Sequence, residues 1–289
     1  MSAATMNSLS SISPSWRFPM MRIDTSIAKY SITVRINMMA ILTASRTIFS
    51  GSWQIISNEG DFLKIIVDSK ENISKTVADM MAERLTLKPE SVLSFTADES
   101  LVPIFSELCG RNCCENAVFF NLCDYVVPKA DSEETSLHLL RSSLFSKLGI
   151  THVHSPDLAK PDEYDELIAE HGGIDIVLLG MGLNGCIGFN EPFTPYDSRT
   201  HIAMLTEVTR RAGAERFGSF ENVPNFGVTM GLKTICESKT AILAAFGSEK
   251  ADIVHKLVYG KTMTDVPAAM LQMHRDMILC LDEEAAAKL

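Results

Sequence analysis

Short, uninterrupted apolar runs alternate with amphipathic stretches along this chain, and this alternation limits the fold more than any other feature. The apolar runs are residues 62–67, 92–96, 117–122, 174–180, 239–246 and 277–281. Apolar residues recur at helical spacing in the stretches 72–87, 101–109, 136–148, 161–171 and 248–259. Apolar runs of this length are typical of parallel strands that are buried on both faces. We therefore predict the α/β class, with a mostly parallel sheet between two layers of helices in a three-layer αβα arrangement.

Charge divides the chain into two parts. Its 26 basic and 36 acidic residues give a formal net charge of −10. Residues 1–52 hold five bases and one acid, so they carry +4 and leave −14 for residues 53–289. We predict a single α/β domain over 53–289, preceded by an N-terminal extension. A domain of this charge has no general attraction for DNA or RNA phosphates, so we expect no nucleic-acid partner.

The N-terminal segment 1–52 has two open interpretations. It is rich in Ser, carries Arg and is poor in acids, as organelle transit peptides are. It shows no clear amphipathic Arg face and no cleavage signal, which favours a simple extension. No apolar run approaches the roughly 20 residues that span a bilayer, so we expect no membrane partner. The expected location is the cytoplasm, or an organelle if the segment is a transit peptide.

The cysteines and histidines predict no metal site. Seven cysteines in a chain of this length, with no secretory signal, are typical of reduced thiols. Cys109, Cys113 and Cys114 lie close together, but no second pair of ligands follows at zinc spacing. His152 and His154 share one face of an extended segment and lack an obvious third ligand, so we expect them to be surface residues.

A glycine motif follows the apolar run at 174–180. Residues 180–185 read GMGLNG, which satisfies the G-x-G-x-x-G pattern of dinucleotide sites, and Glu207 lies where a ribose-binding acid is expected. However, Gly188 and Pro192 leave little room for the helix whose N-terminus holds a pyrophosphate. We expect these glycines to let the backbone approach a smaller ligand, and we predict no cofactor.

The segment GMGLNGCIGFNEP, residues 180–192, resembles the signature loop of the glucosamine-6-phosphate deaminase/isomerase family. The likeness covers most of residues 61–289 and includes FFNLCDY at 119–125, SRT at 198–200 and GSEK at 247–250. The NEP ending argues against the related sugar-phosphate lactonases. Asn184 is similar to the galactosamine-6-phosphate branch, because the glucosamine enzymes carry Asp there.

This resemblance implies a modified Rossmann-like sheet and a metal-free reaction. In that reaction a 2-amino-2-deoxyhexose 6-phosphate becomes a ketose 6-phosphate and releases ammonia. A homo-oligomer is also implied as an option. The family's ligand contacts map onto the glycine loop and onto the loop after the first core strand, which places Thr96, Ala97, Gly182 and Gly185 at the substrate.

The catalytic positions implied by the resemblance are substituted. The ring-opening His maps to Cys186, its carboxylate partners map to Asn184 and Glu191, and the proton-shuttling carboxylate maps to Cys123, beside Asp124. Only Glu191 keeps its chemistry. A thiol serves as a base only if its pKa is lowered, and Asp124 would raise the pKa of Cys123. Imidazole accepts a proton at one nitrogen while it donates at the other, which a thiol cannot do.

Three interpretations of these substitutions remain open. The chain is an enzyme with impaired or altered activity; or it is an inactive homologue that binds a sugar phosphate or a protein partner; or Cys123 and Cys186 have gained a thiol role, such as a redox disulfide. Inert reduced thiols are the simpler alternative to the last of these.

The phosphate site is altered as well. The family's loop resembles T-G-[GA]-[ST]-P, whereas residues 96–100 read TADES. Asp98 and Glu99 therefore replace small donors, and carboxylates within about 4–6 Å of a phosphate would repel it. Arg216 and Lys250 fall where the family places cationic phosphate ligands, so part of an anion site is predicted to remain.

Overall fold

A mostly parallel sheet forms the centre of the molecule. The computed structural model describes residues 52–58, 61–128, 132–260 and 264–289, so nearly all of the predicted N-terminal extension lies outside the described residues. The strands of the central sheet are β1 (Ser52–Asn58), β2 (Asp61–Val67), β3 (Val92–Phe95), β4 (Val118–Asn121), β6 (Ile176–Leu179), β9 (Thr240–Ala245) and β10 (Met277–Leu281).

The strand order of this sheet is β1-β2-β10-β9-β6-β3-β4. The neighbouring pairs from β2 to β4 are parallel, and β1 pairs antiparallel with β2 at one edge. The mostly parallel sheet predicted from the apolar runs is therefore confirmed. The runs over β3, β4, β6 and β9 extend beyond their strands by one residue or more, whereas the run 277–281 coincides with β10 and the run 62–67 is one residue shorter than β2. Consecutive strands β3 and β4 are neighbours, whereas the chain then crosses to β6 on the other side of β3, so the strand order reverses at β3 and β6.

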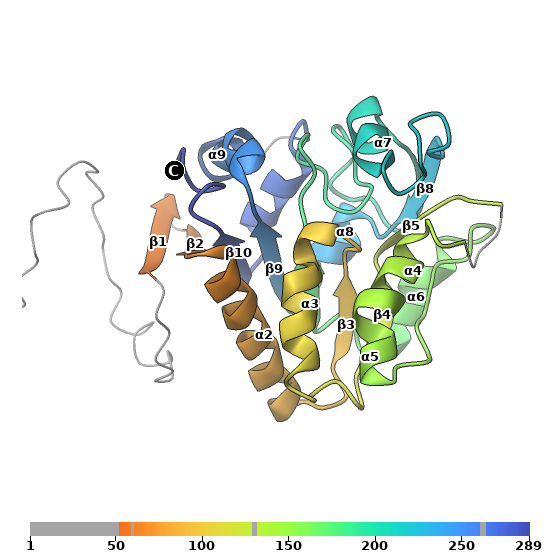
Figure 1. Cartoon of the computed structure of the whole chain (residues 1–289), viewed down its shortest axis with the longest axis horizontal. Coiled ribbons are helices and arrows are strands. Elements are labelled where there is room, and N and C mark those ends of the chain that lie inside the picture. The colour runs from red at the N-terminus through yellow and green to blue at the C-terminus, as the bar shows by residue number, and fades with distance from the viewer. Residues whose placement is uncertain (1–51, 59–60, 129–131, 261–263) are drawn as a thin grey trace, which may run out of the picture.

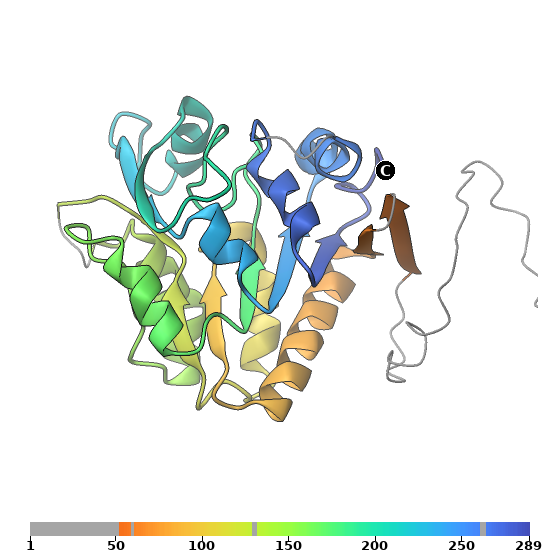
Figure 2. The same ribbon diagram turned by 180° about the vertical axis from the view of Figure 1, so that it is seen from behind.

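Helices cover both faces of the sheet, which confirms the three-layer arrangement (Figures 1 and 2). The front layer in Figure 1 contains α2 (Lys70–Leu87), α3 (Val102–Cys109), α4 (Ser136–Leu140), the π-helical turn η2 (Arg141–Phe145) and α5 (Ser146–Leu148). The layer seen from behind in Figure 2 contains α6 (Glu163–Glu170), α8 (Leu232–Cys236) and η4 (Pro267–Met273), with α9 (Ala251–Tyr259) at the carboxyl end of the sheet.

Alternation within each strand explains why the runs are continuously apolar. Leu93 and Phe95 of β3 pack with the buried residues of α2 and α3. Val92 of the same strand points the other way and packs with Tyr164 and Ile168 of α6. Successive side chains of a strand point to opposite faces, so a strand covered on both faces favours apolar residues on both; the exception in β3 is the buried Ser94.

A second, smaller sheet was not predicted. Its strands are β5 (Cys123–Tyr125), β8 (Phe226–Thr229) and β7 (His201–Met204), in the order β5-β8-β7, and all of its pairs are antiparallel. These strands are short, and Ile202, Met204 and Phe226 are exposed, so no apolar run marks them. Helix α7 (Glu207–Gly213), which lies above this sheet in Figure 1, was also missed.

Asp175 ties three strands together at the amino end of the sheet. Its carboxylate accepts hydrogen bonds from Lys88 Nζ at 2.6 Å, Lys239 Nζ at 2.6 Å and the backbone N–H of Val92 at 2.8 Å. Burial by itself raises the pKa of Asp175, but the bonds from Lys239, Lys88 and Val92 outweigh burial and hold this pKa below its ordinary value.

We expect Asp175 to contribute to the pH dependence of stability. The pKa of Asp175 is lower in the folded chain than in the unfolded chain, where Asp titrates at about 3.9. The stabilisation by Asp175 is therefore present above about pH 4 and is lost as the pH falls through the pKa of the folded chain. Asp175→Asn should cost about 1–2 kcal/mol of unfolding free energy near neutral pH, since both lysines are half-exposed. Urea unfolding from neutral to acid pH should show a smaller acid loss in the variant, and equal losses in both proteins would contradict this role.

Candidate active site

A cavity of about 220 Å³ opens at the carboxyl ends of the central strands, where the strand order reverses. Open α/β sheets place their ligands at this point. Of the site residues predicted from the sequence, eight line the cavity: Thr96, Ala97, Cys123, Gly182, Asn184, Cys186, Arg216 and Lys250. Asp124, Gly185 and Glu191 do not line it.

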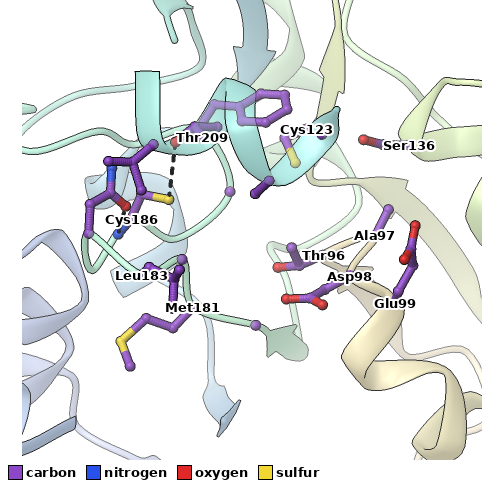
Figure 3. A pocket seen from close by; sticks show the side chains of 18 of the residues that line it. Thr96, Ala97, Asp98, Glu99, Cys123, Ser136, Met181, Leu183, Cys186 and Thr209 are labelled. Atoms are coloured by element: carbon purple, nitrogen blue, oxygen red, sulfur yellow. Dashed lines mark hydrogen bonds between the residues drawn. The ribbon is translucent and has the colours of Figure 1, made fainter. Parts of the chain in front are cut away.

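The two predicted catalytic cysteines lie in the wall of this cavity as buried, free thiols (Figure 3). Burial is the main reason that the pKa of Cys123 lies far above its ordinary value, and Asp124 adds to the shift as the sequence predicts. Burial, followed by the charge of Glu191, raises the pKa of Cys186 to about 12. Both side chains are therefore neutral thiols near neutral pH, and neither is a ready general base.

Glu191 holds the loop behind Cys186 rather than facing the cavity. Its carboxylate accepts hydrogen bonds from Asn184 Nδ2 at 2.8 Å, from the Thr206 hydroxyl at 3.1 Å and from the Thr206 N–H at 3.1 Å. Asn184 Oδ1 in turn accepts the backbone N–H of Cys186 at 3.1 Å. The amide and the carboxylate thus position the backbone of Cys186.

Sequence reasoning missed the contribution of α7 to this network. Thr206 caps the helix, and its side chain accepts the N–H of Thr209. The Thr209 hydroxyl lies 3.9 Å from Cys186 Sγ, the contact dashed in Figure 3. A Thr placed just before a helical stretch is a usable N-cap signal, and it would have revealed this helix.

Asp124 has a different place from the one predicted. Its carboxylate accepts the N–H groups of Ser136 at 2.7 Å, of Leu137 at 3.2 Å and of Tyr125 at 2.8 Å, and the side-chain amide of Asn121 at 3.2 Å. Burial raises its pKa, and the backbone hydrogen bonds oppose that shift. These bonds join Asp124 to the end of β4 and the start of α4, and Asp124 is not among the residues that line the cavity.

We expect Asp124→Ala to lower stability rather than ligand affinity. The substitution leaves the first N–H groups of α4 without their acceptor, which should cost about 2 kcal/mol of unfolding free energy in a urea titration. Thr135→Ala is a matched control, because Thr135 caps the same helix through the N–H of His138 and does not line the cavity. A variant that stays as stable as the wild type but no longer binds ligand would restore the predicted catalytic role.

The glycines of the signature loop have separate tasks. Gly182 faces the cavity, and an added Cβ there would lie 2.5 Å from Cys186 Sγ. Gly185 has a φ of +81° and turns the chain behind the cavity, where an added Cβ would lie 2.8 Å from Val266. No helix begins in this loop; the next one is α7, which starts at Glu207. The helix end that a dinucleotide site requires is therefore missing from this motif.

The histidines and clustered cysteines do not form a metal site in the part of the chain that the structure describes. The fold brings His171 close to the pair His152 and His154. The ring centroids of His154 and His171 are 4.9 Å apart, and those of His152 and His154 are 4.6 Å apart. Burial, and then the two neighbouring imidazoles, lower the pKa of His154. Phe120 stacks against His154, so these rings also pack on the core.

The parallel sheet with its cavity at the reversal of strand order defines an α/β protein of the Rossmann-like class. The family model for glucosamine-6-phosphate isomerases and 6-phosphogluconolactonase matches residues 70–280. This chain belongs to that family, as the resemblance of the signature loop predicts.

Among the residues that the structure describes, no helix combines the length and the apolar composition that a membrane span requires.

Relatives and solved structures agree with this assignment. Glucosamine-6-phosphate deaminases of Clostridium botulinum are 36% identical over 238 residues, which cover 78% of this chain and 98% of the relative. The enzyme of Clostridioides difficile is 35% identical over the same length. A monomeric glucosamine-6-phosphate deaminase of the NagB superfamily superposes with a TM-score of 0.71 at 32% identity, covering 78% of this chain and 99% of that one. A 6-phosphogluconolactonase from Thermotoga maritima, at 16% identity and a TM-score of 0.62, shares the fold, and the match covers 76% of this chain and 99% of that one.

Proposed function

We propose that this chain binds an amino sugar of the hexosamine class in the cavity and has an impaired form of the family's isomerase/deaminase activity. The observation that carries this proposal is the pair of buried, neutral thiols at Cys123 and Cys186. The family's chemistry requires a group that moves a proton between C2 and C1 and a group that opens the sugar ring. General acid–base groups of this kind contribute about 10²–10⁴-fold each, so the loss of two of them removes most of the acceleration.

The hexosamine bound is proposed to be of the galactosamine type. The support is the resemblance of Asn184 to the galactosamine-6-phosphate branch. Asn184 lines the cavity, and its amide donates to Glu191, where an Asp would bring a second negative charge against that carboxylate. The relatives are named as glucosamine-6-phosphate deaminases, so the two epimers have to be compared directly. Location in the cytoplasm is part of the same proposal.

An ammonia-release assay with thermal-shift measurements tests the proposed function. Galactosamine and glucosamine, each free and as the 6-phosphate, are supplied to the purified full chain. We expect at least one of these sugars to raise the melting temperature and ammonia release to remain near the uncatalysed rate. Rapid release from any of them would refute impairment. No thermal shift with all four sugars would refute the binding role itself.

A role in protein association is the second candidate, and an exposed apolar patch favours it. Met204 is 74% exposed and lies opposite Phe226, which is 48% exposed, and Ile202 is on the same face of the small sheet. A second copy of this chain is the proposed partner. Sedimentation of the wild type and of Met204→Glu tests it: an oligomer that the substitution weakens supports the role, and a monomer at every concentration excludes it.

A further inference from the structure

Thr96 carries an unused polar group in the cavity wall. The residue is 9% exposed and lines the cavity, and its hydroxyl is buried without a hydrogen-bond partner among the described residues. A buried hydroxyl without a partner is costly, so an atom of a ligand or a water is expected to satisfy it. Figure 3 shows the side chains of Thr96 and Asp98 pointing to the same side, toward the loop that carries Met181.

Asp98 presents a carboxylate oxygen beside this hydroxyl. Its Oδ1 accepts the N–H of Ser100 at 2.8 Å, whereas its Oδ2 accepts no hydrogen bond from the residues that the structure describes. An added Cβ at Gly180 would lie 2.4 Å from Oδ2, so the glycine leaves the space that this oxygen occupies. Thr96 and Asp98 together offer a hydroxyl and a free acceptor to the ligand.

The loop after β3 has few backbone donors left for an anion. The N–H of Asp98 bonds to Thr96 O at 3.0 Å, the N–H of Ser100 bonds to the Asp98 carboxylate, and the N–H of Leu101 bonds to Asp98 O at 3.0 Å. Phosphate cradles depend on free N–H groups that point at the ligand. Here Asp98 takes up two such donors through its own side chain and carbonyl.

The two predicted cations are also engaged. Arg216 Nη2 lies 3.3 Å from Glu99 Oε1, and Lys250 Nζ donates to Met181 O at 2.6 Å. The charged residues that line the cavity are therefore two acids and two bases, Asp98, Glu99, Arg216 and Lys250. A dianionic phosphate would therefore enter a site that has no surplus of positive charge.

We propose that the site takes a hexosamine without a 6-phosphate, whose hydroxyl or ammonium groups donate to Asp98 Oδ2 and bond with the Thr96 hydroxyl. This inference rests on the proposed function and narrows its substrate class. Hydroxyl and ammonium groups are donors, and a carboxylate accepts from them by charge-assisted hydrogen bonds. The same carboxylate repels a phosphate, so one residue favours the free sugar and disfavours the phosphorylated one.

Isothermal titration calorimetry of the full chain tests this selection. The titrants are galactosamine, glucosamine, their 6-phosphates and inorganic phosphate. We expect the free sugars to bind at least about tenfold more tightly than the 6-phosphates, and inorganic phosphate not to bind. Asp98→Asn keeps an oxygen for the N–H of Ser100 and removes the charge; it should weaken the free sugars about tenfold and strengthen the 6-phosphates about tenfold. Glu170→Gln removes an exposed acid of α6 outside the cavity and should change neither.

Each outcome separates the inference from the proposed function. Tighter binding of the 6-phosphates by the wild type would overturn the inference and leave the amino-sugar role in place. Binding of none of the sugars would overturn both. A third outcome is that the free sugars bind, but the ratio of their affinity to that of the 6-phosphates is the same in Asp98→Asn, Asp98→Ser and the wild type. Asp98 would then not be the residue that distinguishes free from phosphorylated sugars. A melting curve of each variant shows whether it is folded at the temperature of the titration.

Discussion

The double variant Cys123→Asp with Cys186→His is expected to release ammonia from a hexosamine about 10²–10⁴ times faster than the wild type. The exchange places a carboxylate and an imidazole at the two positions where the resemblance puts the proton shuttle and the ring-opening base. Glu191 and Asn184 already position residue 186 through hydrogen bonds to the loop. The assay follows ammonia with each of the four sugars, free and phosphorylated.

The single variants and one distant variant control this experiment. Groups that act in one reaction are not additive, so each single exchange should restore much less activity than the pair. Cys109→His makes the same exchange at a partly buried thiol outside the cavity and should leave the rate unchanged. If the folded double variant binds a sugar and still releases no ammonia, the thiols are not the cause of impairment. A further loss, such as a misplaced substrate, would then have to explain it.

Phe95→Ala is expected to have the largest effect on stability, about 3–5 kcal/mol of unfolding free energy. Phe95 is the last residue of β3 and is 1% exposed. Its ring lies 5.9 Å from that of Phe105 in α3 and 5.7 Å from that of Phe119 in β4, measured between centroids. Truncation leaves a cavity where three elements meet, because packed rings cannot relax fully into the space.

Urea titration of Phe95→Ala measures this loss, and Leu87→Ala is its control. Leu87, at the end of α2, is 78% exposed, so its truncation should change the unfolding free energy by less than about 0.5 kcal/mol. A loss of unfolding free energy below about 1 kcal/mol for Phe95→Ala would show that packing of this ring contributes little to the stability of the core. Because Thr96 follows Phe95 directly and Asp98 lies two residues further on, we also expect the variant to bind its sugar more weakly.

Family membership suggests an active enzyme, whereas the side chains at the cavity suggest a weak one. The relatives align over nearly their whole length, and the cavity lies where the fold places a ligand. Yet the groups at the cavity are thiols, an amide and an added pair of acids. A fold can keep its core and its loop geometry while the side chains that determine activity change, so the site has to be judged on its own residues.

Sequence patterns predicted the central strands, which are buried on two faces, and failed for the short strands of the small sheet. Continuous apolar runs located β3, β6 and β9, because both faces of a central strand meet apolar neighbours. Strand β7 was missed, since it has an intermediate-exposed-buried-exposed pattern and only four residues. Periodicity needs length and burial before it becomes visible.

The sequence also predicted the position of some site residues and not of others. The signature loop located Cys186, Asn184 and Gly182 at the cavity, because a short loop between fixed elements carries its residues with it. The resemblance of FFNLCDY also suggested a catalytic role for Asp124, whose neighbour Cys123 does line the cavity. Adjacent residues of a strand point to opposite sides, so one faces the ligand space and the other binds the start of α4.

By itself, the sequence of this protein determined the α/β class, the family, and the identities of the residues that replace its acids and bases. Only the tertiary structure decided which groups meet. The pairing of Arg216 with Glu99 joins residues from distant parts of the chain, and the unpartnered hydroxyl of Thr96 depends on everything that packs around it. Charge, burial and hydrogen bonding are properties of neighbours in space, and linear order does not specify those neighbours.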